Sequence, residues 1–138
     1  MFTVLSSKDL ARLQRLQNSA ACVIFAVSRR VDASPLLEAL HWLPVSSRIT
    51  FKILLYVFKI LNSQAPGYLT ELLSYYKPAR CLRSSSDTTR LVLHSSATAI
   101  GDKRFQIVAA KSWNLLPTEI RTATSIVTFK KLLKTYLF

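Results

Sequence analysis

The stretch Pro44–Asn62, PVSSRITFKILLYVFKILN, has the strongest helical pattern in this chain. Its apolar residues recur at the three- and four-residue steps of an α-helix, and proline is well suited to a helix start. We therefore expect a long amphipathic helix that opens at Pro44 or Ser46. Its apolar stripe consists of Ile49, Ile53, Val57, Ile60 and Leu61. A second face carries the basic residues Arg48, Lys52 and Lys59.

Helical patterns also precede this stretch. Ser6 or Ser7 can cap a helix whose apolar residues recur as far as Val27, because a serine side chain accepts from the free N–H groups of the first turn. The same helix carries a basic stripe, made of Lys8, Arg12 and Arg15. Cys22 falls in its apolar run and is expected in the core. A short helix should then start at Ser34-Pro35, with Ser34 as its cap.

The C-terminal half is expected to be mostly helical as well. Helices are predicted over residues 68–75, after Asp102 as a cap, from Pro117 to Ile120, and from Thr124 or Ser125 to the end. Leu91–His94 has β-propensity, and Ala97–Ile100 could pair with it as a small hairpin. Two helix corners share an order in which a tryptophan ends one helix and a proline begins the next. The structural residues of these corners are Trp42, Pro44, Trp113 and Pro117.

These elements predict a mainly α fold, a compact multi-helix domain of about five to seven helices with at most one small β-hairpin near 91–100. Glycine occurs only twice in 138 residues, which disfavours a turn-rich barrel or sandwich. The length suits a single domain over 1–138. Within it we expect a helical subregion (6–76), a basic serine-rich loop (77–90) and a C-terminal subregion (91–138).

The charge is strongly unbalanced. Nineteen Lys and Arg against seven Asp and Glu give a formal net charge of +12 and a pI near 10.2. Such a surplus favours a polyanionic partner, RNA or DNA, over a purely solvating surface or one that docks on an acidic protein domain. The expected nucleic-acid contacts are Lys8, Arg12, Arg15, Arg48, Lys52, Lys59, Arg80, Arg83 and Arg90.

Residues that could carry catalysis are sparse and scattered. The seven acids form no cluster that could hold two metal ions, and no glycine-rich phosphate loop is present. Cys22 and Cys81 have no second cysteine nearby, so no metal clip is indicated. His41 and His94 are interpreted as structural. We therefore expect no catalytic residue, metal, cofactor or small-molecule substrate, and a chain that is not itself an enzyme.

No targeting or membrane segment is apparent in the sequence. Charged residues such as Lys8 and Asp9 interrupt the N-terminus before an apolar signal core could form. The most apolar stretch, Phe51–Leu61, is short and contains Lys52 and Lys59. We expect an intracellular chain, nuclear or cytoplasmic and not secreted, with no membrane partner.

Several segments together resemble one family. ARLQRLQNSAA (11–21), LLEALHWLPVSSRITFKILLYVFKILNSQAPGYLTELL (36–73), LRSS (82–85), GDKRFQIVAAKSWNLLPTEIR (101–121) and FKKLLKTYLF (129–138) occur in order over nearly the whole chain. They are similar to the region that follows the reverse transcriptase domain in LINE-type, non-LTR retrotransposons of the jockey-like superfamily. Each motif alone is weak, whereas the ordered set is specific.

The resemblance implies a C-terminal piece of a longer polyprotein whose endonuclease and RNA-directed DNA polymerase lie upstream. In that setting the region would hold template RNA or target DNA, or brace the polymerase. This sequence lacks the endonuclease, fingers and palm, and also the Cys/His knuckle of some LINE tails. The opening MFTVLSSKD is expected to mark a reading frame that begins inside a truncated copy. The alternatives are a protein-interaction or structural domain that packed on the missing polymerase, and a relic with no selected function.

Overall fold

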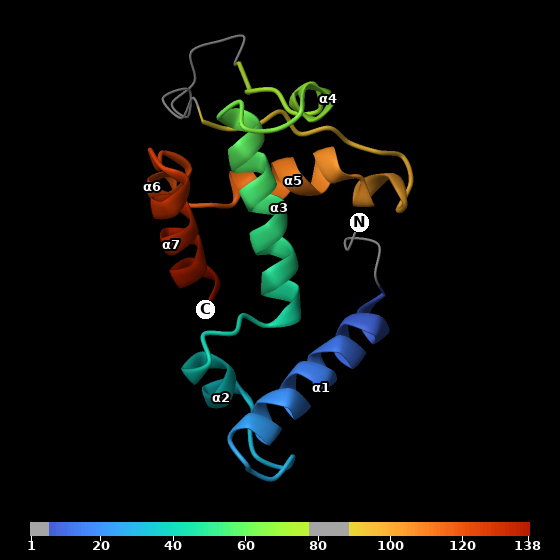
Figure 1. The fold of residues 1–138 in the computed structure, drawn as a ribbon. Helices are drawn as coiled ribbons and strands as arrows, with labels where there is room; N and C mark the ends of the chain where they lie inside the picture. The colour runs from blue at the N-terminus through green and yellow to red at the C-terminus, as the bar shows by residue number, and fades with distance from the viewer. Residues whose placement is uncertain (1–5, 78–88) are drawn as a thin grey trace.

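The computed structural model describes residues 6–77 and 89–138 and shows helix α3 running through the centre of the molecule (Figure 1). The elements are α1 (Ser7–Ile24), α2 (Ser34–Ala39), α3 (Val45–Leu61), α4 (Gly67–Thr70), the 3₁₀ turn η2 (Gly101–Lys103), α5 (Phe105–Asn114), α6 (Thr118–Arg121) and α7 (Ile126–Leu137). The described ranges thus hold seven α-helices and no sheet, which confirms the predicted mainly α fold class.

The main core lies where α3 packs against α5 and α7. Phe58 of α3 stacks on Phe129 of α7 with ring centroids 4.3 Å apart. Trp113 of α5 lies 5.9 Å from the same Phe129 ring, so one buried aromatic group joins all three helices. Aromatic pairs at such separations add to the stability gained by burying their area. Leu54 and Leu133 complete the centre of this core.

The corner from α5 to α6 also anchors an extended segment. Pro117 is the residue before α6, as the sequence predicts. The indole Nε1 of Trp113 donates to the carbonyl of Thr89 at 2.9 Å. The Asn114 side chain holds the backbone of Leu91 with two hydrogen bonds: its Oδ1 accepts from the Leu91 N–H and its Nδ2 donates to the Leu91 carbonyl, each at 2.9 Å. Side chains of α5 therefore take the place of a neighbouring strand.

The hairpin considered over residues 91–100 does not form. Leu91 instead makes an isolated antiparallel bridge with Tyr75, and the N–H of Val92 donates to the carbonyl of Ser74 at 2.9 Å. Leu91 is buried in the main core, so its side chain and its backbone are held by different neighbours. Packing against α5 overrides the local preference of the segment for a hairpin.

Three local predictions were wrong in position. The helix expected over residues 68–75 ends at Thr70. Asp102 does not cap α5; it lies in η2, where its carboxylate is 4.0 Å from the ammonium of Lys111. Ser34 is inside α2, and the carboxylate of Asp32 accepts from its N–H and hydroxyl. By contrast, the predicted caps Ser6 and Ser125 do accept from the first turns of α1 and α7.

Helices α1 and α2 pack at the other end of α3, below the main core in the view of Figure 1. Two glutamines of α1 fix this arrangement. Gln14 Oε1 accepts from the N–H of Val45 at 2.8 Å, and Gln17 Nε2 donates to the carbonyl of Leu43 at 2.9 Å. Cys22 is buried here, as predicted. Polar side chains thus attach α1 to the start of α3, in contrast to the apolar contacts of the main core.

None of the helices in the described ranges has the combined length and apolar character that crossing a membrane requires.

Candidate functional surfaces: a basic helix face and an apolar groove

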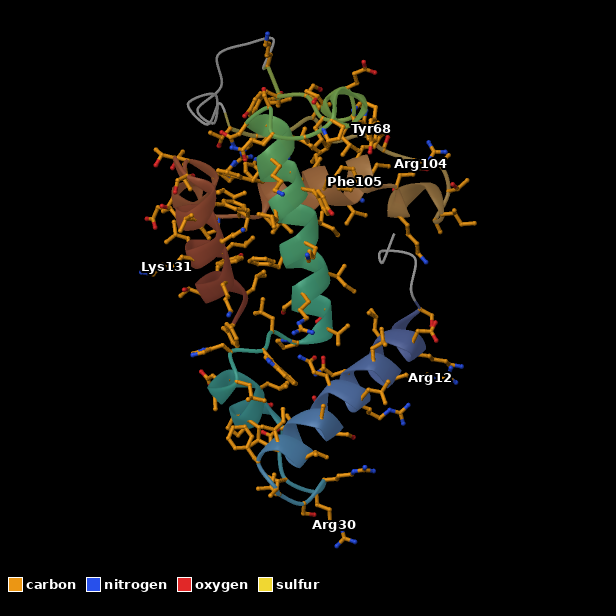
Figure 2. The ribbon with its side chains drawn as sticks, viewed as in Figure 1. Arg12, Arg30, Tyr68, Arg104, Phe105 and Lys131 are labelled. Atoms are coloured by element: carbon orange, nitrogen blue, oxygen red, sulfur yellow. The ribbon has the colours of Figure 1, made fainter. Side chains whose placement is uncertain are left out.

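The basic stripe predicted on the first helix forms one exposed face of α1, called here the α1 basic face (Lys8, Arg12 and Arg15). Steps of four and three residues place these side chains above one another on a helix. Arg12 points away from the rest of the molecule in Figure 2. Its guanidinium lies 3.7 Å from the carboxylate of Asp9, and such exposed pairs are weak. Arg12 therefore remains able to contact an external anion.

Beside this face lies a small hollow of about 380 Å³ that Arg15 shares with Arg29. Asn18 and Ser19 line it as well, so it offers several hydrogen-bond donors. Asp32 also lines the hollow, and hydrogen bonds from the backbone N–H and then the hydroxyl of Ser34 lower the pKa of its carboxyl below the ordinary value.

Sequence patterns did not single out Arg29, which lies between the helix expected as far as Val27 and the helix expected from Ser34. Only the return of the chain alongside α1 brings Arg29 next to Arg15. The one available signal was the Arg29-Arg30 pair itself. Arg30 points outward at the end of the molecule in Figure 2, beyond the turn that follows α1.

A larger groove of about 900 Å³ separates α1 from the upper part of the molecule. Successive turns of α3 line it. Among the described residues that line the groove, Arg48 and Lys52 are the only Lys, Arg, Asp or Glu side chains. Both cations are exposed, and no ion pair within the described ranges involves either of them. The groove therefore has a positive rim.

The walls of the groove are mainly apolar. Aliphatic side chains of α1, α3 and α4 contribute, together with Tyr56, Tyr68 and Phe105. Tyr68 and Phe105 lie near each other at the upper end of the groove, on α4 and α5 (Figure 2), and Tyr68 is 71% exposed. The aliphatic residues are Leu13, Val45, Ile49, Ile53 and Leu69.

One residue that lines the groove has a buried acceptor without a partner within the described ranges. Gln17 lines it and is only 9% exposed, yet its Oε1 atom has no hydrogen-bond partner within the described ranges. Leaving a buried acceptor unpaired costs about 1–3 kcal/mol. The sequence pattern placed Ile49 and Ile53 in a core-facing stripe and gave no indication of a groove.

Apolar side chains of α1 continue this surface outside the groove. Leu13, Leu16, Ala20 and Val23, called here the α1 apolar seam, follow one another at steps of three, four and three residues. All four are exposed, Leu16 by 68% and Val23 by 69%. Such spacing is typical of a helix that packs along another helix.

Of the nine predicted nucleic-acid contacts, the seven that the structure describes do not lie on one surface. Lys59 is half-buried on α3 beyond the groove, and Arg90 lies in the segment that bridges to Tyr75 and its neighbours. Arg80 and Arg83 lie outside the described residues, as does Cys81. Lys131 of α7 projects from the opposite side of the molecule to Arg12 in Figure 2. Positive charge is therefore distributed around the molecule, with separate clusters on α1 and at the groove.

The other residues considered for chemistry are dispersed. His41 and His94 are both exposed. Within residues 6–77 and 89–138, no three His, Cys, Asp or Glu side chains come together in a way that could hold a metal ion. Of the corner residues, Trp113 is buried and Trp42 half-buried, while Pro44 and Pro117 directly precede α3 and α6.

No family model matches the chain, and searches among curated proteins and among solved structures find no match either. Function must therefore be inferred from the residues and the geometry of the chain itself.

Proposed function

We propose that this chain is a basic, non-catalytic accessory domain that contacts the phosphate backbone of RNA or DNA through the α1 basic face. The observation that carries the proposal is the alignment of Lys8, Arg12 and Arg15 on one exposed helix face, next to the hollow that Arg15 shares with Arg29. Lysine and arginine on such a face neutralise phosphates and release their counterions, which supplies most of the affinity of sequence-independent binding.

The resemblance described above supports the same role. Under this proposal the chain corresponds to the region that follows the polymerase domain in LINE-type, non-LTR retrotransposons, and copying of RNA into DNA belongs to the upstream domains. The net charge of +12 favours a polyanionic partner.

A mobility-shift assay on labelled RNA and DNA across a salt series tests the proposal. If four side chains contact phosphate, log K should fall with log salt at a slope of about −3 to −4 for duplex DNA, and less steeply for single strands. The triple variant Lys8→Glu/Arg12→Glu/Arg15→Glu should flatten this slope and weaken binding at every salt concentration.

The matched control is Lys130→Glu/Lys131→Glu/Lys134→Glu on α7, which reverses as many charges on another helix. It should weaken binding much less than the α1 variant. A slope near zero for the unchanged protein, or equal losses in both triple variants, would contradict a specific role for the α1 basic face.

A second candidate function is that of a protein-interaction or structural domain that packs on a partner such as a polymerase. The observation that favours it is the exposed α1 apolar seam together with the apolar groove. Contiguous exposed apolar surface commonly marks a binding site for another protein.

A further inference from the structure

We propose that the groove binds an amphipathic helix from a partner protein, with aliphatic side chains on one face of that helix and carboxylates along its edge. This inference rests on the second candidate function and names the chemistry of the partner. It does not depend on nucleic-acid binding by the α1 basic face, which lies on another side of α1.

The shape and lining of the groove favour this occupant. A volume of about 900 Å³ can accept several aliphatic side chains, and most of the lining is aliphatic or aromatic. Recognition of an amphipathic helix commonly uses such a groove, with anchor residues at positions i, i+3, i+4 and i+7 of the ligand. Leu13 belongs to both the groove and the α1 apolar seam, so a bound helix could extend from one onto the other.

The charge of the groove indicates which polar groups the bound helix should carry. Arg48 and Lys52 lie one helical turn apart on the rim, and no carboxylate from residues 6–77 or 89–138 lines the groove. An acidic edge on the incoming helix would meet both cations, which steers association and fixes orientation. A second copy of this chain is disfavoured as the occupant, because each copy carries a net charge of +12.

Gln17, one of the residues that line the groove, has a buried acceptor that a ligand could reach only after a small movement. Its Oε1 is buried and has no partner within the described ranges, while its Nε2 donates to the carbonyl of Leu43. A small shift that exposes Oε1 to a donor of the ligand would satisfy this acceptor. A polar side chain beside the aliphatic anchors of the helix is suited to that contact.

A nucleic acid fits this groove less well than a helix. Tyr56, Tyr68 and Phe105 could stack on bases, but the five aliphatic side chains offer no hydrogen bonds to base edges. Two cations also provide less phosphate neutralisation than the α1 basic face with Arg29. Binding of single-stranded RNA in the groove is therefore treated as the competing outcome.

Fluorescence anisotropy with the full chain and two designed peptides tests the proposal. The first peptide, about 18 residues long, segregates leucines at helical spacing from glutamates on its edges, and so forms about five turns of helix. The second has the same composition in a scrambled order. We expect the amphipathic peptide to bind at least about tenfold more tightly than the scrambled one, because only it presents a continuous apolar face.

Three variants locate the site. Arg48→Glu/Lys52→Glu should lower the affinity for the amphipathic peptide about tenfold or more, since like charges then face each other. Lys130→Glu/Lys131→Glu on α7, with the same change in net charge, should have less than about a twofold effect. Tyr56→Ala/Tyr68→Ala removes exposed aromatic area without reversing charge, and should also weaken the peptide. Circular dichroism confirms that each variant is folded.

The same titrations with labelled single-stranded RNA separate the two proposals. If the Arg48→Glu/Lys52→Glu protein binds the peptide more weakly but binds RNA as before, the docking site is supported and is distinct from the nucleic-acid contact. If the wild-type protein binds the peptide but no RNA, the proposed nucleic-acid contact is contradicted and the proposed docking site is supported. Three results would overturn the docking site. The two peptides could bind equally, or the two charge variants could lose equal affinity for the amphipathic peptide. The third is an Arg48→Glu/Lys52→Glu protein that loses affinity for RNA alone.

Discussion

Three helices end on a left-handed residue that is not glycine. Ala26, His41 and Ser63 follow α1, α2 and α3 with φ values of 52°, 52° and 55°. In each case the hydrogen bonds are those of a Schellman motif; after α3, for example, Ser63 N–H donates to Ile60 and Gln64 N–H to Lys59. The motif closes the last turn of each helix at the expense of backbone strain, because a Cβ atom disfavours positive φ.

Replacing Ser63 by glycine is therefore expected to stabilise the protein. The exposed Ser63→Gly change relieves the left-handed strain and should raise the free energy of unfolding by about 0.5–1 kcal/mol. Urea unfolding monitored by circular dichroism measures this change. Ala20→Gly, inside α1, is the control and should lower stability by about 1 kcal/mol. A destabilised Ser63→Gly protein would show that the Ser63 side chain outweighs its backbone strain.

At the scale of residues, the predicted caps Ser6 and Ser125 are confirmed, whereas Ser34 and Asp102 do not cap their helices. Ser6 and Ser125 carry an explicit signal, a hydroxyl that accepts from the first turn. The usual signal for an end is glycine, and only Gly67 and Gly101 occur in the chain, neither of them at these helix ends. Left-handed Ala26 and His41 could not be recognised from residue type.

Helices α1 and α7 show how similar patterns lead to different burial. Both are amphipathic and both carry basic residues beside an apolar face. Phe129 and Leu133 of α7 are fully buried, because α3 and α5 cover that face. Leu16 and Val23 of α1 are largely exposed, because α1 reaches the rest of the molecule through Gln14, Gln17 and its contacts with α2.

This difference predicts unequal effects of truncating the two helices. Phe129→Ala removes the ring that touches both Phe58 and Trp113, and should cost about 3–5 kcal/mol of unfolding free energy. Leu16→Ala removes an exposed side chain and should change stability by less than about 0.5 kcal/mol. Denaturant unfolding of both variants measures the two changes. A comparable loss in Leu16→Ala would mean that the α1 apolar seam is covered in solution.

At the scale of the whole molecule, the surplus of positive charge causes electrostatic self-repulsion. The net charge is +12, and positive side chains project from several sides. The screening length falls from about 30 Å at 0.01 M salt to about 10 Å at 0.1 M. Repulsion between clusters is therefore strong only in dilute buffer.

The melting temperature should consequently rise when NaCl is raised from about 0.01 M to about 0.1 M, because screening relieves the self-repulsion of the compact state. The measurement is a melting curve by circular dichroism at each salt concentration. Lys130→Glu/Lys131→Glu lowers the net charge by four, from +12 to +8, and should reduce the salt effect. A melting temperature that falls with salt would indicate that favourable ion pairs outweigh the repulsion.

The sequence by itself determined the helical fold class, the long central helix and the basic stripe of α1, because periodicity and capping act over a few residues. Tertiary contacts set which apolar faces are buried and which neighbour Leu91 takes. They also bring Arg48 and Lys52 to the groove and place Arg15 and Arg29 in the lining of one hollow. These features depend on contacts between residues far apart in the chain. The polar attachment of α1 through Gln14 and Gln17 leaves its apolar seam uncovered, and no local pattern specifies that outcome.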